Sequence, residues 1–211
     1  PIAIIPVLCK LFSAVILARI GPALDLLQDP EQGGFRPDYS CSDMITFIRL
    51  IAEKAEEWGE EVWAASLDLE KAFDKVSHEA LHLAVERMNV DEKIRNLIKE
   101  IYKRPKLKIE VDGNSSRWYF QETGIRQGCP LSPYLFLLVM SVMFYDMKKE
   151  DHLGLIAQRQ ENCNMDEILF ADDTIIMSKN TRALNKFLSE KDTNINQIKK
   201  IVLFRTQTSA Q

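Results

Sequence analysis

Two adjacent aspartates between two short apolar segments constrain this chain more than any other feature of its sequence. The segments are Ile168–Phe170 and Thr174–Met177, and Ala171, Asp172 and Asp173 separate them. Such short apolar segments indicate strands, and the brief connection between them predicts a β-hairpin. Two like charges beside buried strands are costly unless a cation compensates them. The sequence therefore predicts a hairpin with a cation close to its turn.

A third carboxylate ends another strand-like segment. Val62–Asp68 is mostly apolar and short for a helix, so we expect a buried strand that ends at Asp68. If the strand lies beside the hairpin, Asp68 joins Asp172 and Asp173. Carboxylates without nearby His or Cys suit Mg²⁺ or Mn²⁺, and three of them can hold two ions roughly 3.5–4 Å apart for phosphoryl transfer. For an isolated Asp-Asp pair, a solvated turn is the commoner alternative.

The rest of the chain mixes helices with strands. Apolar residues recur at helical spacing in five segments: after Pro6, over 44–55, after Ser77, after Asp91 and after Ser132. Residues 107–120 instead alternate around Asp112-Gly113, which predicts a second hairpin. Elements that do not alternate strictly favour an α+β fold, with helices packed on one face of a mainly antiparallel sheet.

The composition limits how the chain can attract a charged partner. Its 211 residues are 46% hydrophobic, and 31 acidic against 27 basic residues give a net charge of -4. No global attraction for nucleic acid follows, so any nucleic-acid surface must be local. The longest apolar run near the start, Leu11–Ala18, is shorter than the ~20 residues of a membrane span, so we expect no membrane partner.

Four motifs, in order along the chain, resemble those of reverse transcriptases from non-LTR (LINE-type) retrotransposons and group II introns. Ala65–Val76 is similar to the first catalytic motif of this family, and Phe170–Asp173 is similar to the second. Gly124–Pro133 resembles the motif that lines the nucleotide pocket, and Gln32–Pro37 resembles a motif of the fingers. The resemblance covers roughly residues 1–180 and fades after that, with only an echo over 194–200.

The resemblance implies the fingers and palm of a right-hand polymerase. We expect truncated fingers over 1–61, a palm over 62–205 with interleaved fingers elements around 78–122, and an unassigned tail over 206–211. No thumb has room in these residues. Because the chain opens at Pro1 within an apolar segment, we expect it to be a fragment.

The resemblance also assigns roles to individual residues near the carboxylates. It implies that Asp68 and Asp172 ligate two Mg²⁺ ions, with Mn²⁺ as a possible substitute, and that Asp173 completes the acidic cluster. The backbone carbonyl of Leu69 would be a further ligand. Phe73 would be a steric gate, because its ring would occupy the space that a ribose 2′-hydroxyl needs. A core phenylalanine is the alternative at that position.

Other roles concern the nucleotide and its phosphates. Gln127 and Gly128 would border the incoming nucleotide, the glycine because a close backbone approach leaves no room for a side chain. Arg36 would support the fingers or contact phosphate or template, and Lys10 and Arg126 are weaker candidates for neutralising phosphate. A solvated surface charge is the alternative for each of these cations.

The function implied is RNA-directed DNA polymerase, with an RNA template, a DNA primer or nicked target DNA, and deoxynucleoside triphosphates as partners. The parent element would act inside the cell, in the cytoplasm and the nucleus. A catalytically inactive remnant or maturase-like RNA-binding module is the first alternative, and a generic two-metal phosphodiesterase is the second. The sequence leaves the oligomeric state open.

Overall fold

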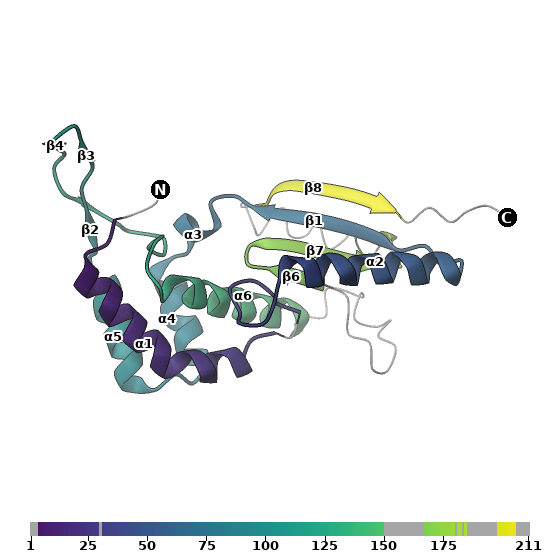
Figure 1. Ribbon diagram of the computed structural model, residues 1–211, viewed down its shortest axis with the longest axis horizontal. Coiled ribbons are helices and arrows are strands. Elements are labelled where there is room, and N and C mark those ends of the chain that lie inside the picture. The colour runs from purple at the N-terminus through teal and green to yellow at the C-terminus, as the bar shows by residue number, and fades with distance from the viewer. Residues whose placement is uncertain are drawn as a thin grey trace. The chain divides into compact units, whose positions relative to one another are not determined.

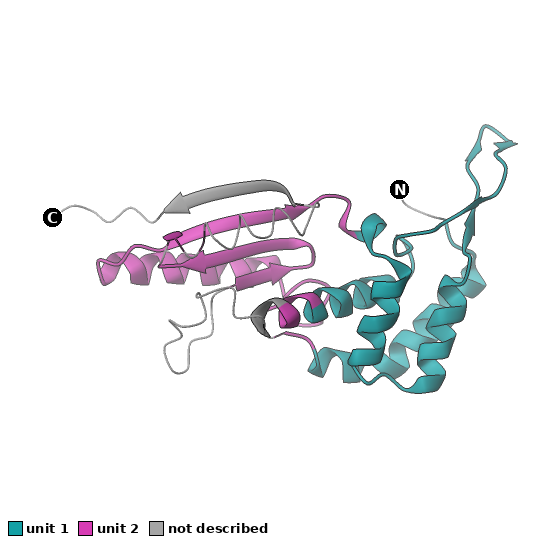
Figure 2. Ribbon diagram, turned by 180° about the vertical axis from the view of Figure 1, so that it is seen from behind, with its two compact units in different colours: residues 1–27, 73–142 teal, residues 28–72, 143–211 magenta. Residues whose placement is uncertain are grey.

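A computed structural model describes residues 4–29, 31–149, 167–179, 181–182, 184 and 198–205, with only the backbone of 147–149 and 198–205. The fold is α+β, as the sequence predicts. The chain divides into two compact units, one of residues 1–27 and 73–142 and the other of residues 28–72 and 143–211 (Figure 2). Residues 28–61 therefore belong to the unit that holds the large sheet, whereas the sequence groups them with residues 1–27.

A four-stranded antiparallel sheet is the centre of the second unit (Figure 1). Its strands, in spatial order, are β6 (Glu167–Phe170), β7 (Asp173–Ser178), β1 (Trp63–Leu69) and β8 (Ile198–Arg205). The predicted strand and the predicted hairpin are both present, and β1 pairs directly with β7. Strand β8 was not predicted, since the resemblance fades before it.

Helix α2 (Cys41–Glu57) packs on one face of this sheet (Figure 1). It begins at a capping box, in which Ser40 and Asp43 satisfy each other's backbone N–H groups. The apolar stripe of the helix covers a small buried cluster of Ala64, Ile168 and Met177 from three strands. Burying one large apolar side chain contributes roughly 1.5–3 kcal/mol, so this contact fixes α2 on β1, β6 and β7.

The opposite face of the sheet is buried as well. Successive strand residues point to opposite faces, so Ala65 and Leu67 point away from the face that carries Ala64. Ala65 is fully buried, and Leu67, Leu169 and Ile176 are also buried. A sheet buried on both faces leaves its strand ends as the places where charged side chains can reach solvent.

The first unit is mainly helical. It contains α1 (Val7–Leu26), α4 (His78–Arg87), α5 (Glu92–Tyr102) and the beginning of α6 (Ser132–Lys149), and the short α3 (Ala72–Lys75) precedes α4. The predicted caps are confirmed, because the side chain of Ser77 accepts from Ala80 and that of Asp91 accepts from Lys93 and Ile94. Buried apolar residues line these helices: Leu81, Ile98, Leu135 and Phe136.

Helix α1 is longer than the uninterrupted apolar run Leu11–Ala18 indicates. The helix has 20 residues, and an 18-residue window of it has a mean hydropathy of 1.8, enough by length and composition to cross a membrane; only 22% of that window is buried. Val7 and Leu8 are among its most exposed side chains. The sequence estimate was too short because it stopped at Lys10 and Arg19, which the helix includes.

The predicted second hairpin is confirmed in the first unit. Its outer part pairs β3 (Glu110–Val111) with β4 (Asn114–Ser115), and its base pairs β2 (Lys106–Leu107) with β5 (Tyr119–Phe120). Both turn residues have positive φ, 48° at Asp112 and 77° at Gly113. This is the conformation that the Asp-Gly pair favours in two-residue turns.

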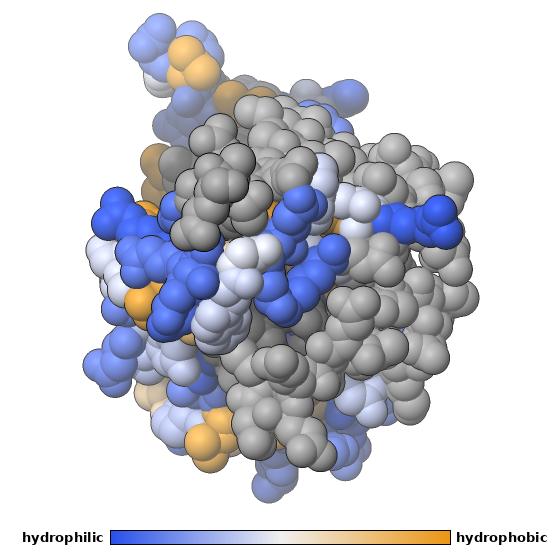
Figure 3. Space-filling model, turned by 90° about the vertical axis from the view of Figure 1, so that its right-hand side faces the viewer, coloured by the Kyte–Doolittle hydropathy of each residue, from blue (hydrophilic) through white to orange (hydrophobic). Residues whose placement is uncertain are grey.

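The surface near the end of α2 is polar. Figure 3 shows this side of the molecule, and the described residues drawn on it are mainly hydrophilic with scattered apolar ones. In the sequence, the end of α2 carries Glu53, Lys54, Glu56 and Glu57. Lys54 is paired with Glu57 within the same helix. The acidic balance of the chain is thus concentrated in part on a solvated helix end.

Candidate active site

The sheet brings the three predicted aspartates together at one end of its two central strands. The register of β1 on β7 runs from Trp63 opposite Ser178 to Leu67 opposite Thr174. One step further along both strands are Asp68 and Asp173, and residues opposite each other in an antiparallel pair project from the same face. Asp172 precedes β7 in the turn. The carboxylates therefore gather where β1 ends and β7 begins.

The electrostatics of Asp173 agree with this placement. Its pKa is raised above the ordinary value of 3.8, first by partial loss of hydration and then by the negative charges of Asp172 and Asp68. Asp68 and Asp172 are half-buried and Asp173 is exposed. The site thus concentrates negative charge at the solvent-accessible end of a buried sheet, where a cation can be attracted.

The turn of residues 171–173, here called the carboxylate turn, is held by hydrogen bonds to the buried side chain of a glutamine. The side-chain oxygen of Gln32 accepts from the backbone N–H groups of Ala171 and Gly34, both at 2.8 Å. The side-chain nitrogen of Gln32 donates to the Ala171 carbonyl at 3.3 Å. Ala171 has a φ of 60°, a conformation that alanine rarely adopts without support. Gln32 is 1% exposed, so water cannot replace these bonds.

Gly34 lets the two segments touch. A Cβ at this position would lie 2.2 Å from the Ala171 nitrogen and 2.9 Å from the Phe170 carbonyl carbon. Both atoms are backbone, so neither can move aside as the end of a flexible side chain could. The glycine is therefore required by close backbone packing against the carboxylate turn.

The loop before α2 is also joined to the sheet by backbone bonds. The N–H of Gly33 donates to Leu169 at 2.8 Å, and that of Leu169 donates to Glu31 at 3.0 Å. Arg36 stabilises the same loop, since its guanidinium donates to the carbonyls of Asp29 and Gln32, each at 3.1 Å. The expected roles of Arg36, support of the fingers or contact with phosphate or template, stay predictions.

Strand β1 is irregular at the end that carries Asp68. Its register against β8 shifts between Asp68 and Leu69, which marks a bulge. Bulges of this kind re-aim side chains and often occur beside active sites. Leu69 itself is buried, so its side chain belongs to the core. The proposed use of its carbonyl as a ligand stays a prediction.

The predicted nucleotide-pocket residues lie in the other unit and form a second group. Phe73 is half-buried and stacks on Phe136, with 4.4 Å between ring centroids and an interplanar angle of 14°. Gln127 approaches Asp74 at 3.5 Å, and Gly128 has a φ of 101°, which favours glycine. Phe73 is thus anchored as a gate residue would need to be, and its role stays a prediction.

The weaker phosphate candidates differ in their surroundings. Arg126 donates to the carbonyl of Ile101 at 2.8 Å and lies over the ring of Tyr102. It therefore joins the loop before α6 to α5. Lys10 is exposed on α1. Neither placement tests a contact with phosphate.

A different carboxylate cluster has tighter geometry. Among the described residues, Asp29, Glu31 and Glu167 offer ligand oxygens that all lie within 4.8 Å of one another. The sequence did not single them out, because Glu167 is far from the other two along the chain. This cluster is a rival cation site, and it must be separated from Asp68, Asp172 and Asp173 by experiment.

Gln32 and Gly34 are the residues that sequence reasoning missed. The segment Gln32–Pro37 was recognised as a shaped loop, yet only Arg36 was expected to take part in the site. The signal available was the Gly-Gly pair itself, which indicates a close backbone approach without naming the partner. The partner, Ala171, is 139 residues from Gln32.

An antiparallel sheet that carries an aspartate-rich hairpin turn beside a strand with an aspartate near its end is the arrangement expected of a nucleotide-polymerising palm domain. The chain belongs to the family "Reverse transcriptase (RNA-dependent DNA polymerase)", whose model matches residues 1–202. The match includes β1, the carboxylate turn and most of β8. It also includes all of α1, so we assign that helix to the reverse transcriptase fold.

Relatives in sequence are polyproteins of non-LTR retrotransposons. The Pol polyprotein of the type-2 retrotransposable element R2DM of Drosophila melanogaster is 27% identical over 190 residues, which are 90% of this chain and 17% of that protein. The RNA-directed DNA polymerase of the mobile element jockey of Drosophila funebris is 27% identical over 186 residues, 86% of this chain and 19% of that protein. The chain thus spans about a fifth of the length of these relatives. It is a reverse transcriptase domain, and the relatives it resembles in sequence come from elements of the LINE type.

Solved structures confirm the fold. Apo telomerase of Candida tropicalis, truncated from its C-terminal domain, superposes with a TM-score of 0.67 at 12% identity, over 94% of this chain and 41% of that one. Telomerase of the same organism with a fragment of telomeric RNA gives 0.68 at 12% identity, over 94% and 34%. At this identity the likeness shows the shared fingers and palm architecture alone.

Proposed function

We propose that this domain is the polymerising part of an RNA-directed DNA polymerase, which extends a DNA primer on an RNA template from deoxynucleoside triphosphates. The observation that carries the proposal is that Asp68, Asp172 and Asp173 lie together where β1 ends and β7 begins, in a chain of this family. The parent element would act in the cytoplasm and the nucleus.

The carboxylates fit the divalent metals that reverse transcriptases use. Their donors are hard oxygens, and partial loss of hydration together with the negative charges of Asp172 and Asp68 raises the pKa of Asp173. Asp68, Asp172 and the carbonyl of Leu69 would hold two Mg²⁺ ions. When bound there, the ions supply positive charge to the attacking 3′-hydroxyl and to the leaving pyrophosphate.

The protein's own residues position the reaction. Gln32 and Gly34 fix the carboxylate turn, so that Asp172 and Asp173 are held before substrate arrives. Phe73, anchored on Phe136, would exclude a ribose 2′-hydroxyl. No side chain acts as the nucleophile, because the primer supplies the attacking oxygen.

Primer extension tests this proposal. The domain, within its full-length parent protein, should extend oligo(dT) on poly(rA) with Mg²⁺, and Asp172→Asn should lower the rate by a factor on the order of a thousand or more. A matched surface change, Asp91→Asn, removes one exposed charge but keeps an oxygen that can cap α5, so it should leave extension intact. RNA binding without any extension by the wild type would favour an inactive RNA-binding module.

Nucleotide selection tests the role of Phe73. Phe73→Ala should raise ribonucleotide incorporation relative to deoxynucleotide incorporation, on the order of tenfold to a hundredfold, because the space beside the ribose opens. Phe136→Leu, which keeps the gate and loosens its anchor, should raise it less. Unchanged selection in Phe73→Ala would remove the gate from the proposal and favour a generic phosphodiesterase.

A further inference from the structure

The hairpin of residues 104–120, here called the hairpin arm, is exposed almost throughout. Every side chain from 106 to 120 is exposed except that of Ser116, which is half-buried. Trp118 is 62% exposed and Phe120 48%. Large aromatic side chains on an otherwise solvated hairpin are unusual, because an isolated two-stranded hairpin is marginally stable in water and gains little from exposed rings.

The exposed groups are sorted by face. Lys106 pairs with Phe120 and Leu107 with Tyr119. Because side chains alternate along each strand, Lys106 and Phe120 share one face, and Leu107 and Tyr119 share the other. The same alternation places Lys108 and Trp118 on the face of Lys106.

Cations lie over the rings of this first face. The Arg104 guanidinium is 4.7 Å from the centroid of Phe120, and the Lys106 ammonium is 5.2 Å from it. The Lys108 ammonium is 5.9 Å from the centroid of Trp118. Arg104, Lys106, Lys108, Trp118 and Phe120 thus form one mixed surface, here called the basic aromatic face.

The charge of the arm contrasts with that of the chain. Residues 104–120 contain four cations (Arg104, Lys106, Lys108 and Arg117) and two carboxylates (Glu110 and Asp112), a net charge of +2 in a chain of net charge -4. Within the described part of the chain, no carboxylate forms an ion pair with Arg104 or Lys106. The arm is therefore a local positive surface. A chain with a negative net charge can bind an anionic partner only through such a local surface.

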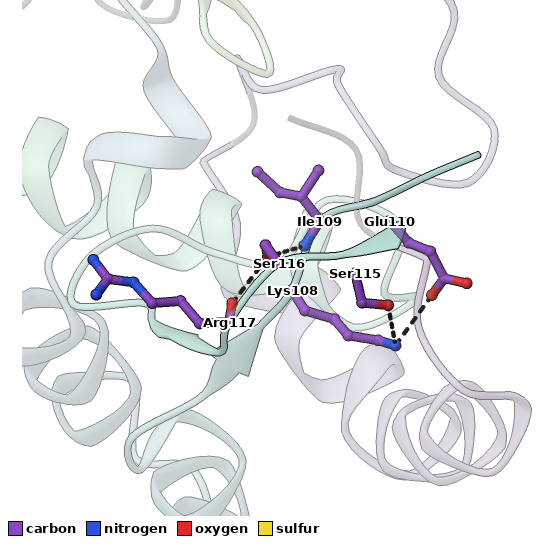
Figure 4. A network of polar contacts seen from close by, with 6 residues as sticks. All are labelled: Lys108, Ile109, Glu110, Ser115, Ser116 and Arg117. Atoms are coloured by element: carbon purple, nitrogen blue, oxygen red, sulfur yellow. Dashed lines mark hydrogen bonds and ion pairs between the residues drawn. The ribbon is translucent and has the colours of Figure 1, made fainter. Parts of the chain in front are cut away.

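Hydrogen bonds hold the arm in one conformation (Figure 4). Ser116 links the strands, since its hydroxyl accepts from the Ile109 N–H and donates to the Arg117 carbonyl, both at 2.9 Å. Lys108 is held by Ser115 at 3.2 Å and Glu110 at 3.1 Å, and the Arg117 side chain extends away from them. Lys108 is thus partly neutralised, so Arg104 and Lys106 are the main free charges on the basic aromatic face.

We propose that the basic aromatic face binds single-stranded nucleic acid. An unpaired base would stack on Trp118, and the backbone phosphates beside it would contact Arg104 and Lys106. A duplex fits less well, because its bases are already stacked and cannot cover the indole ring. The inference deepens the proposed function and rests on it only for the origin of the strand, as template or as primer.

Binding measured without catalysis tests the proposal. The full domain is titrated in EDTA against fluorescent single-stranded RNA, single-stranded DNA and duplex. Each probe is about 20 nucleotides long, which is enough for several bases to reach the stacking positions. Single strands should bind more tightly than duplex. Tighter binding of RNA would identify the template strand, and tighter binding of DNA would identify the primer strand. Because EDTA removes the metals, failed primer extension alone leaves this result unaffected.

Matched variants assign the binding to one face. Trp118→Ala should weaken single-strand binding about tenfold, whereas Tyr119→Ala on the opposite face should weaken it less than about twofold. The pair Arg104→Ala and Lys106→Ala should lower the slope of log K against log salt by about 1.4, at about 0.7 for each phosphate contact. Lys103→Ala with Arg117→Ala removes the same charge elsewhere and should lower the slope by less than half as much.

Three results would overturn the proposal. The first is single-strand affinity in Trp118→Ala equal to that of the wild type, and the second is an equal loss in Tyr119→Ala. The third is the absence of single-strand binding together with Trp118-dependent binding to phosphatidylserine vesicles, which would make the face a lipid contact. Because the altered side chains are exposed, circular dichroism and melting temperature should stay unchanged in every variant.

Discussion

The carboxylate turn and the hairpin arm are both tight turns between antiparallel strands, yet they are built in opposite ways. The carboxylate turn is held by buried Gln32 and by backbone packed on Gly34. The arm is held mainly by its own hydrogen bonds and exposes its rings and cations. The turn for which we propose chemistry is thus fixed by the residues packed around it, whereas the arm for which we propose binding depends on its exposed side chains.

The sharpest way to break this comparison is to add one methyl group beneath the carboxylate turn. Gly34→Ala should lower the free energy of unfolding by about 3 kcal/mol or more, because the new Cβ would lie 2.2 Å from the Ala171 nitrogen. Gly33→Ala is the control, since its Cβ would meet only the flexible end of Met44 at 2.5 Å. Urea denaturation measures both. Equal losses would show that Gly34 is not specially packed.

Removing the polar contacts of Gln32 should have the next largest effect. Gln32→Met keeps the length of the side chain but leaves the N–H groups of Ala171 and Gly34 without an acceptor, which costs about 2 kcal/mol of stability. Because the carboxylate turn would lose its fixed position, kcat for primer extension should fall about tenfold or more with KM for deoxynucleotide little changed. A variant that is less stable but keeps its kcat would reduce Gln32 to a purely structural residue.

Truncating the aromatic side chains of the hairpin arm should leave the free energy of unfolding nearly unchanged. Trp118→Ala combined with Phe120→Ala should lower the free energy of unfolding by only about 0.5 kcal/mol, since both rings are largely exposed. A loss similar to that of Gly34→Ala, measured in the same urea titration, would mean that the rings support the fold. The contrast between packed and exposed turns would then fail.

Replacing Asp173 by Asn should raise the stability slightly, whereas the changes described above lower it. Its pKa is raised in the folded protein, so protonation of this carboxyl favours the folded state. The stabilisation is complete when the pH is below the ordinary pKa of 3.8, and it is lost as the pH rises through the raised pKa. In EDTA at pH 7, Asp173→Asn should therefore be more stable than the wild type, by on the order of 0.5 kcal/mol for such an exposed group. The difference should shrink as the pH falls toward 4. Thermal melting across this range checks it, and a gap that widens at low pH would contradict the assignment.

The local elements of this fold could be read from the sequence because their signals are local. The caps at Ser77 and Asp91, the Asp-Gly turn and the strand that carries Asp68, which ends one residue later at Leu69, follow from spacing and turn chemistry within a few residues. The roles of the three aspartates came from family resemblance, and the register of β1 on β7 places them together.

Other features depend on contacts that no local pattern contains. The clamp of Gln32 on Ala171 joins residues 139 positions apart, and a polar residue in a loop gives no sign of burial. Strand β8 lies where the resemblance fades, and it becomes part of the sheet by pairing with β1. The cluster of Asp29, Glu31 and Glu167 likewise forms only when β6 lies beside the loop before α2. Each of these three features depends on contacts between distant parts of the chain, and the periodicity of the sequence does not predict such contacts.

Manganese binding tests most directly whether Asp68, Asp172 and Asp173 form the metal centre. Mn²⁺ titration followed by electron paramagnetic resonance compares the wild type with Asp172→Asn and with Glu31→Gln, which alters the rival cluster. We predict that Asp172→Asn weakens Mn²⁺ binding about tenfold or more and that Glu31→Gln leaves it intact, because only the first removes a proposed metal ligand. Loss of binding in Glu31→Gln with full binding in Asp172→Asn would place the metal elsewhere and contradict the polymerase centre.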